Sequence, residues 1–328
     1  MSTELAMQER ERKKKLSSGA IQQMLAFASL LALVVFFSFA SGNFLQYSNI
    51  IGILLSTAVI GILALGATFV IITGGIDLSV GTVMTLSSVL TGVIVVNAGM
   101  PIYIGIIGGI LTGAACGFLC GFAVTKLKIP PFIATLAMMM IAKGLALVIS
   151  GAAPIYFSDH PNFTKISLGS IIPGINVPNA IIIFFLMAII GGIILSKTIL
   201  GRYNFSIGSN EEATKLSGVN VDFWKISIYS LAGAFTGVAG VLMASRLNSA
   251  QPALGQGYEL EAIAAVVIGG TSLSGGKGTI VGTVIGALIM SVLTNGLRIM
   301  SIPQEWQTVV VGLVIILAVY ADTFRKKD

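Results

Sequence analysis

The chain has 328 residues, of which 55% are apolar, 39 are glycine and 32 carry a charge, 19 of them basic and 13 acidic. Charged residues make up 10% of the chain, against about 25% in soluble domains, which excludes a water-soluble globule. No charge occurs from Leu16 to Ile76 or from Leu78 to Thr125, and each stretch can hold two membrane spans of about 20 residues. The composition predicts a single all-α, polytopic integral membrane domain.

Charge gaps and turn residues predict about ten transmembrane helices. They lie at 21–40, 49–73, 80–97, 101–123, 131–150, 178–196, 226–245, 259–271, 279–297 and 305–321. The first follows a basic segment, as in a signal peptide, but its length and the poor cleavage site at Ser41-Gly42-Asn43 favour a retained helix. These boundaries leave a basic tail at 1–20, a transmembrane domain at 21–321 with a polar loop at 197–225, and a tail at 322–328.

The basic residues predict the orientation of the chain. Fifteen of the 19 fall in the tails and in loops on one side, whereas Lys165, Arg246 and Arg298 fall on the other side and Lys143 within the fifth span. Because lysine and arginine are enriched in cytosolic loops, both termini are expected in the cytosol and His160 outside. The same distribution accounts for the net charge of +6 without a nucleic-acid partner.

Small residues recur at helical spacing. Glycines occur every fourth residue from Gly105 to Gly121, and again at Gly278, Gly282 and Gly286. Such stripes let helix backbones approach closely, either within one chain or across a homodimer seam. Cys116 and Cys120 lie within the first stripe, where we expect them to serve as small packing residues rather than as a disulfide or a metal site.

A Gly-rich segment is repeated in the two halves of the chain. Gly74-Gly75-Ile76-Asp77-Leu78-Ser79-Val80-Gly81 corresponds to Gly269-Gly270-Thr271-Ser272-Leu273-Ser274-Gly275-Gly276, and each follows a Val/Ile-rich run. Gly-interrupted apolar segments in two halves indicate a candidate internal repeat with broken helices around a central site. The predicted topology favours a parallel relation, and an inverted one requires that one segment lie deeper in the membrane.

Four charges fall near membrane depth: Asp77, Lys143, Glu259 and Glu261. Burying such a group costs about 3 kcal/mol or more, so it commonly marks a pathway or pairs with a partner. Local alternatives exist, because Asp77 can cap a helix beginning near Leu78 and Lys143 can pair internally or extend to the interface. The two glutamates can also sit at the outer interface.

Neither catalysis nor nucleotide binding is predicted for this chain. His160 is the single histidine, and no nucleophile or metal-ligand set accompanies it, so we expect no enzyme activity and no bound metal or other cofactor. The segment Leu273-Ser274-Gly275-Gly276-Lys277 superficially looks like a nucleotide-binding loop. A P-loop requires a glycine six residues before the lysine and Ser or Thr after it, whereas here these positions hold Thr271 and Gly278.

The polar loop at 197–225 contains a predicted short helix, Asn210 to Ser217. Ser209 and Glu212 have the spacing of a capping box, and Gly218 supplies the C-terminal stop. Ala213 and Leu216 share one face of this helix. A small apolar face on a helix too short to be stable alone suggests docking to a partner protein, with packing on the chain's own membrane domain as the alternative.

The loop from Leu200 to Val219 resembles the cytosolic coupling loop of permease subunits of bacterial ATP-binding-cassette sugar importers, the ribose permeases most closely. The resemblance extends over most of the chain after residue 49. It is carried further by Gly75–Gly81, Pro131–Leu136, Ser249-Ala250-Gln251-Pro252, Gly257-Tyr258-Glu259-Leu260 and Ile263–Gly278.

The resemblance implies a homodimeric, multi-pass permease in the bacterial inner membrane. A cytosolic subunit would hydrolyse ATP-Mg, and a periplasmic or extracellular protein would deliver the sugar. Ribose is the expected substrate, with xylose, galactose and allose as alternatives. In this family the coupling role would fall to Ser209, Asn210, Glu211, Glu212, Ala213, Leu216 and Gly218.

Two further sets of residues are expected to meet the substrate or the delivering protein. A weakly polar path would involve Asp77, Ser79, Asn248, Gln251 and Asn295. Arg246 and Arg298 would dock acidic groups of the binding protein or, alternatively, anchor the chain at lipid headgroups. An ion-coupled or passive carrier remains the alternative from a different class, with Asp77 as its one fair relay candidate.

Overall fold

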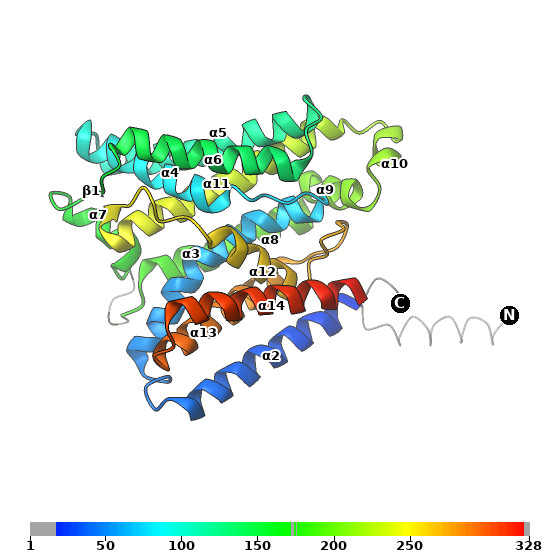
Figure 1. The fold of residues 1–328 in the computed structure, drawn as a ribbon. Helices are drawn as coiled ribbons and strands as arrows, with labels where there is room; N and C mark the ends of the chain where they lie inside the picture. The colour runs from blue at the N-terminus through cyan, green and yellow to red at the C-terminus, as the bar shows by residue number, and fades with distance from the viewer. Residues whose placement is uncertain (1–17, 172–173, 175, 325–328) are drawn as a thin grey trace.

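The computed structural model describes residues 18–171, 174 and 176–324. The predicted tails therefore lie largely outside the described residues, with Arg10, Arg12 and Lys13–Lys15 at one end and Arg325–Lys327 at the other. The elements are α2 (Ser18–Ala40), α3 (Tyr47–Ile72), α4 (Val80–Gly92), the π-helix η1 (Val93–Asn97), α5 (Ile102–Thr125), α6 (Pro131–Ser150), β1 (Ile155–Tyr156), α7 (Pro161–Leu168), α8 (Asn179–Lys197), α9 (Ile199–Ser209), α10 (Glu211–Leu216), α11 (Val221–Leu247), β2 (Ser249–Ala250), α12 (Tyr258–Ile268), α13 (Ile280–Ile299) and α14 (Gln304–Phe324) (Figure 1).

The prediction of an all-α polytopic membrane protein is confirmed. Within the described ranges, eight helices are long and apolar enough to cross a membrane, and α14 contributes a shorter apolar stretch. Each of the ten predicted spans coincides with a helix, but the eighth is α12, which has only 11 residues. At about 1.5 Å per residue, α12 reaches only part of the way through a bilayer.

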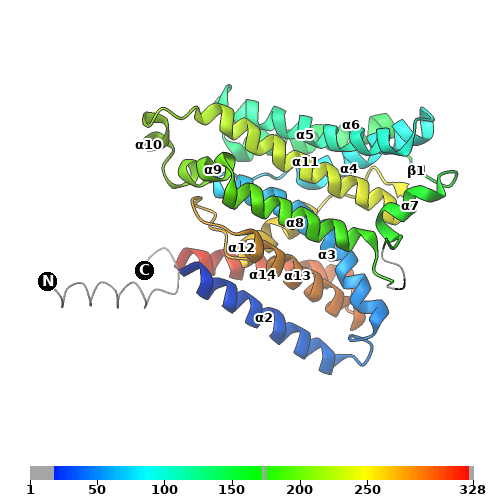
Figure 2. The same cartoon turned by 180° about the vertical axis from the view of Figure 1, so that it is seen from behind.

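The two ends of the bundle differ in what they carry. Helix α2 begins and α14 ends at the end that carries α10, whereas α7 and β1 lie at the opposite end (Figures 1 and 2). Gln23 donates to Thr279 at 2.7 Å where α2 and α13 begin, and Asn295 donates to Asn49 at 3.0 Å toward the other end. We call the end that carries α10 the α10 end, and the end that carries α7 and β1 the α7 end. The start of α2 and the end of α14 thus lie on the same side of the bundle, as the predicted topology requires.

Glycine contacts hold the centre of the bundle together. A side chain at Gly113 would collide with the carbonyl oxygen of Gly233, and one at Gly117 with that of Tyr229. Helices α5 and α11 therefore touch through their backbones. The glycine stripe on α5 serves packing within the chain, which was the first of the two alternatives for this stripe. Cys116 and Cys120 are free and buried in the same helix.

Candidate functional site

The two repeated Gly-rich segments meet at the α10 end of the bundle. Each follows a helix that runs toward this end, α3 or α12, and precedes one that runs away from it, α4 or α13 (Figure 1). The backbone amide of Gly276 donates to the carbonyl oxygen of Ile72 with an N···O distance of 2.9 Å. Gly74, Gly275 and Gly276 have φ values of +81°, +83° and +71°, which side chains disfavour. The two segments therefore have the same direction along the bundle, which is what a parallel relation requires.

Helix α9 reaches the same point. A side chain at Gly208 would collide with the carbonyl oxygen of Ile72 and approach the amide of Gly276. We call Ile72, Gly208, Gly275 and Gly276 the glycine junction. It brings the polar loop into backbone contact with both halves of the repeat.

Helix α10 projects from the bundle just after this junction. Asn210 caps it, because its Oδ1 accepts a hydrogen bond from the amide of Ala213 at 2.9 Å. The capping-box prediction was therefore wrong: Ser209 is the last residue of α9, and the helix begins at Glu211. Gly218 does follow the helix with φ of +83°, as its predicted role as a stop requires. Leu216 is 89% exposed on this helix.

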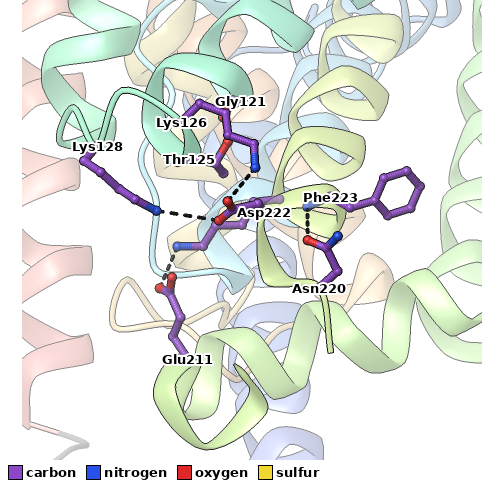
Figure 3. A network of polar contacts seen from close by, with 9 residues as sticks. Gly121, Thr125, Lys126, Lys128, Glu211, Asn220, Asp222 and Phe223 are labelled. Carbon is purple, nitrogen blue, oxygen red and sulfur yellow. Dashed lines mark hydrogen bonds and ion pairs between the residues drawn. The ribbon is translucent and has the colours of Figure 1, made fainter. Parts of the chain in front are cut away.

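Three ion pairs tie α10 and α5 to the start of α11 (Figure 3). Lys225 contacts Glu211 of α10 at 2.6 Å, and Lys126 contacts Asp222 at 2.8 Å, with Lys128 at 3.7 Å from the same carboxylate. The side chain of Asn220 caps α11 by accepting from the amide of Phe223 at 3.1 Å. Lys126 and Asp222 are 96 positions apart in the chain, and the sequence reasoning predicted none of these three ion pairs.

A cavity of about 800 Å³ opens between α3, α11, α12, α13 and α14 toward the α7 end. Its polar lining consists of Ser56, Arg246, Gln256, Tyr258, Glu261, Thr294, Arg298, Gln304, Gln307 and Thr308. The apolar lining includes Val311 and Ile315, which lie further along α14. Along α14 the lining thus changes from polar residues near its start to apolar ones toward the middle of the bundle.

The two outer arginines lie on the wall of this cavity. Arg246 was expected in an outer loop, but it lies in the last turn of α11 and donates to the carbonyl oxygen of Leu55 at 3.2 Å and to Ser56 Oγ at 3.4 Å. Its side chain is half-buried. Arg298, in the last turn of α13, is exposed. The sequence therefore found both residues but not the cavity that they share.

The five residues expected along the substrate path are not gathered in one place. Asp77 is buried, and its Oδ1 accepts from the amide and hydroxyl of Ser79 at 2.8 and 2.6 Å, which stabilises the turn before α4. Asn248 ends α11 with φ of +52°, and Gln251 donates to the hydroxyl of Ser249 at 3.0 Å. Asn295 bonds to Asn49, as described above. None of the five lines the cavity.

The other charges near membrane depth divide in the same way. Lys143 approaches the side-chain oxygen of Gln256 at 3.4 Å, and Glu259 is buried and accepts from the amide of Gly257 at 3.1 Å. Glu261 instead lines the cavity. Within the described ranges, no cluster of three or more His, Cys, Asp and Glu side chains could hold a metal ion.

Comparison with known proteins assigns this chain to a family. Residues 49–319 match the family described as branched-chain amino acid transport system / permease component. The chain belongs to this family. It is therefore a multi-pass membrane permease component, and the matched residues include the glycine junction, α10 and the cavity.

Individual relatives cover nearly the whole chain. The ribose import permease protein RbsC of Bacillus subtilis (strain 168) is 46% identical over 319 residues, 97% of each chain. That of Escherichia coli (strain K12) is 41% identical over 309 residues, 93% of this permease component and 95% of the relative. The xylose transport system permease protein XylH of Haemophilus influenzae is 33% identical over 371 residues, which cover 95% of this chain and 99% of the relative. No solved structure matches.

Proposed function

We propose that this permease component forms the membrane path of an ATP-binding-cassette importer for ribose or a related sugar. The observation that carries this proposal is the identity of 46% and 41% to two ribose import permeases along almost the full chain. The chain is a transport component rather than an enzyme, so ATP-Mg is hydrolysed by a separate ATP-binding subunit. A sugar-binding protein delivers the cargo.

The arrangement of charge supports an orientation with the α10 end in the cytosol. Lys126, Lys128, Lys215 and Lys225 lie at the α10 end, together with Lys197 and Arg202 of the same loop region. Lys165, Arg246 and Arg298 lie at the α7 end. This imbalance fits an inner-membrane protein whose α7 end faces the periplasm or the exterior.

Helix α10 suits a role in docking the ATP-binding subunit. Leu216 is almost fully exposed at its end, and Ala213, Glu211 and Glu212 are also exposed, so little of this helix packs on the chain's own bundle. Asn210 alone separates α10 from α9, whose Gly208 lies at the glycine junction. A push on α10 would reach both halves of the repeat through Gly208.

At the other end, the exposed guanidinium of Arg298 suits an acidic group on the sugar-binding protein. The proposal gives Arg246 a smaller part in this docking, because two of its donors are held by α3. Homodimer formation remains part of the proposal, as do contacts of the substrate with Asp77, Ser79, Asn248, Gln251 and Asn295 during transport.

Reconstitution tests the function directly. The chain is placed in proteoliposomes with its ATP-binding subunit and binding protein, and uptake of radiolabelled ribose is followed with and without ATP. We expect ATP-dependent uptake, with unlabelled xylose, galactose, allose and fructose competing to different degrees. Uptake without ATP that collapses with an ionophore would instead establish the ion-coupled carrier.

A further inference from the structure

Three formally charged side chains line the cavity at the α7 end, two of them basic and one acidic. Arg246, Glu261 and Arg298 all lie on its wall. The ion pairs of the described part of the chain are those at the start of α11, so none of these three is neutralised by an ion pair there. Ionisable groups within a membrane domain usually face water-filled cavities and mark the path of a solute.

Glu261 is directed differently from the glutamate that precedes it by two positions. Glu259 accepts from the amide of Gly257 and approaches Gly81 of α4, so its carboxylate stabilises the loop before α12. Two positions on an α-helix are separated by about 200°, which places Glu261 on the opposite side of α12. That side is the wall of the cavity. Within the described residues, the Glu261 carboxylate makes no hydrogen bond and no ion pair.

Arg246 is held in place and still has free donors. Its two terminal nitrogens bond to Leu55 and Ser56 of α3, which fixes the plane of the guanidinium. A guanidinium has five N–H donors, so the remaining ones are available to a molecule in the cavity. A fixed donor group of this kind loses little side-chain entropy when it binds.

The uncharged polar side chains of the lining also offer both hydrogen-bond donors and acceptors. Gln304 carries an amide and Tyr258 a hydroxyl that can each donate and accept. The hydroxyls of Thr294 and Thr308 donate within their own helices and offer acceptors to the cavity, while Gln307 and Gln256 each make one side-chain hydrogen bond within the chain and keep the rest of their capacity. The α14 residues of the wall recur at intervals of three and four from Gln304 to Ile315, which puts them on one face of that helix. The polar half of this face lies at the start of α14, near the α7 end.

This combination favours a neutral polyol over an ion. A sugar hydroxyl can donate to the Glu261 carboxylate and accept from the Arg246 guanidinium at once, whereas a simple anion can only accept and a simple cation can only donate or be coordinated, so neither can bond to both groups. The volume of about 800 Å³ lies within the range of about 300–1,000 Å³ that is usual for small-molecule sites. A single sugar would be only loosely enclosed there, as release on every cycle requires.

We propose that this cavity is a sugar-binding chamber of the permease itself, in which Glu261 accepts and Arg246 donates hydrogen bonds to hydroxyls of a neutral monosaccharide. The inference rests on the proposed function for the class of cargo. It adds a defined cavity, and two residues outside the proposed path set, Glu261 and Arg246, through which the membrane subunit binds the sugar.

Site-directed thiol labelling tests the chamber without requiring transport. Thr308→Cys places a thiol on the cavity wall, and its reaction with a membrane-impermeant reagent is timed in the full-length permease in nanodiscs, with and without D-ribose. When ribose is at about three times its Kd, labelling should slow about fourfold, because the free fraction of a site is 1/(1 + [L]/Kd). Asp159→Cys, outside the cavity, reports any effect of ribose on the reagent.

Further changes in the Thr308→Cys background assign the contacts. Glu261→Gln keeps the shape of the side chain and should remove most of the protection, as should Arg246→Gln. Glu305→Gln is the matched control, since Glu305 is exposed in the first turn of α14 and does not line the cavity. It should leave the protection intact.

The outcomes separate this proposal from the proposed function. Absence of protection by ribose, or equal protection in the Glu261→Gln and Glu305→Gln proteins, overturns the chamber even if ATP-driven ribose uptake is normal. Protection that depends on Glu261 supports the chamber even if the reconstituted importer prefers another sugar. Failure of uptake bears only on the proposed function, because labelling needs neither ATP nor partner subunits.

Discussion

The amide of Gly276 and the carbonyl oxygen of Ile72 form a hydrogen bond of 2.9 Å between the two halves of the chain. This bond closes the α10 end of α3 onto the segment that precedes α13. Gly208 of α9 packs against the same carbonyl, with no room for a side chain. The loop that precedes α10 therefore cannot shift without displacing the junction between the two Gly-rich segments.

The first prediction concerns this junction. Gly208→Ala should weaken it, because the added methyl group collides with the Ile72 carbonyl, and overpacking of this kind costs about 1–3 kcal/mol. We expect less ribose uptake per ATP hydrolysed in proteoliposomes. Gly144→Ala is the control, since nothing lies within 4 Å of a side chain there. Unchanged coupling in the Gly208→Ala protein would contradict a role for the junction.

The second prediction distinguishes the observed helix cap from the one expected from the sequence. Asn210→Ala should destabilise α10 by about 1 kcal/mol, because it removes the acceptor for the amide of Ala213. Hydrogen exchange of the α10 amides should then become faster. Ser209→Ala should leave exchange nearly unchanged. Faster exchange in the Ser209→Ala protein, with unchanged exchange in the Asn210→Ala protein, would mean that Ser209 provides the cap.

The third prediction concerns the exposed face of α10. Leu216→Glu places a charge at a side chain that is 89% exposed, and should weaken binding of the ATP-binding subunit because that charge loses its water on docking. Co-purification of the two subunits measures the loss. Glu212→Gln, also exposed on α10, should retain binding. Normal assembly and uptake with Leu216→Glu would place the docking site elsewhere.

A fourth prediction tests the backbone contact between α5 and α11. Gly117→Ala should lower the unfolding temperature in detergent, because its methyl group collides with the carbonyl of Tyr229 and must push the helices apart. Gly144→Ala, in the more open α6, should stabilise or leave the protein unchanged, since alanine has the higher helix propensity. Equal unfolding temperatures would argue against a rigid seam.

The fifth prediction concerns the α7 end. Arg298→Glu should raise the concentration of sugar-binding protein needed for half-maximal uptake, and the effect should shrink as salt screens the charges. Lys165→Glu, at the same end but on α7, is the control for general surface charge. An identical response of the two variants at low salt would remove the specific role of Arg298.

The sequence predicted most of the fold because membrane spans are read from local composition. Apolar length located ten of the helices in the described residues, each matching one predicted span, and the positions of basic residues placed the start of α2 and the end of α14 on the same side. The glycine stripe on α5 likewise predicted close packing, but its partner helix depends on three-dimensional contact. The eighth predicted span, 259–271, is the shortest of the ten, and it corresponds to the short α12.

The site was predicted less completely, for reasons of geometry. Arg246 and Arg298 were identified by charge, yet their common cavity is formed by helices from both halves of the chain, and no local pattern specifies it. The cap of α10 was misplaced by one residue because Ser209 and Asn210 are both good caps, and α9 extends through the serine. Glu261 was noted only as a charge near membrane depth, although its direction on α12 distinguishes it from Glu259.

Helix α11 connects the two ends of the molecule as one uninterrupted rod. Lys225 near its start is paired with Glu211 of α10, and Arg246 in its last turn is bonded to α3 on the cavity wall. The two residues are about 32 Å apart along the axis, so a 10° tilt about one end would displace the other by about 5 Å. Because Arg246 of α11 lies on the cavity wall, this displacement would open or close that side of the cavity, and α5 would move together with α11 through their glycine contacts.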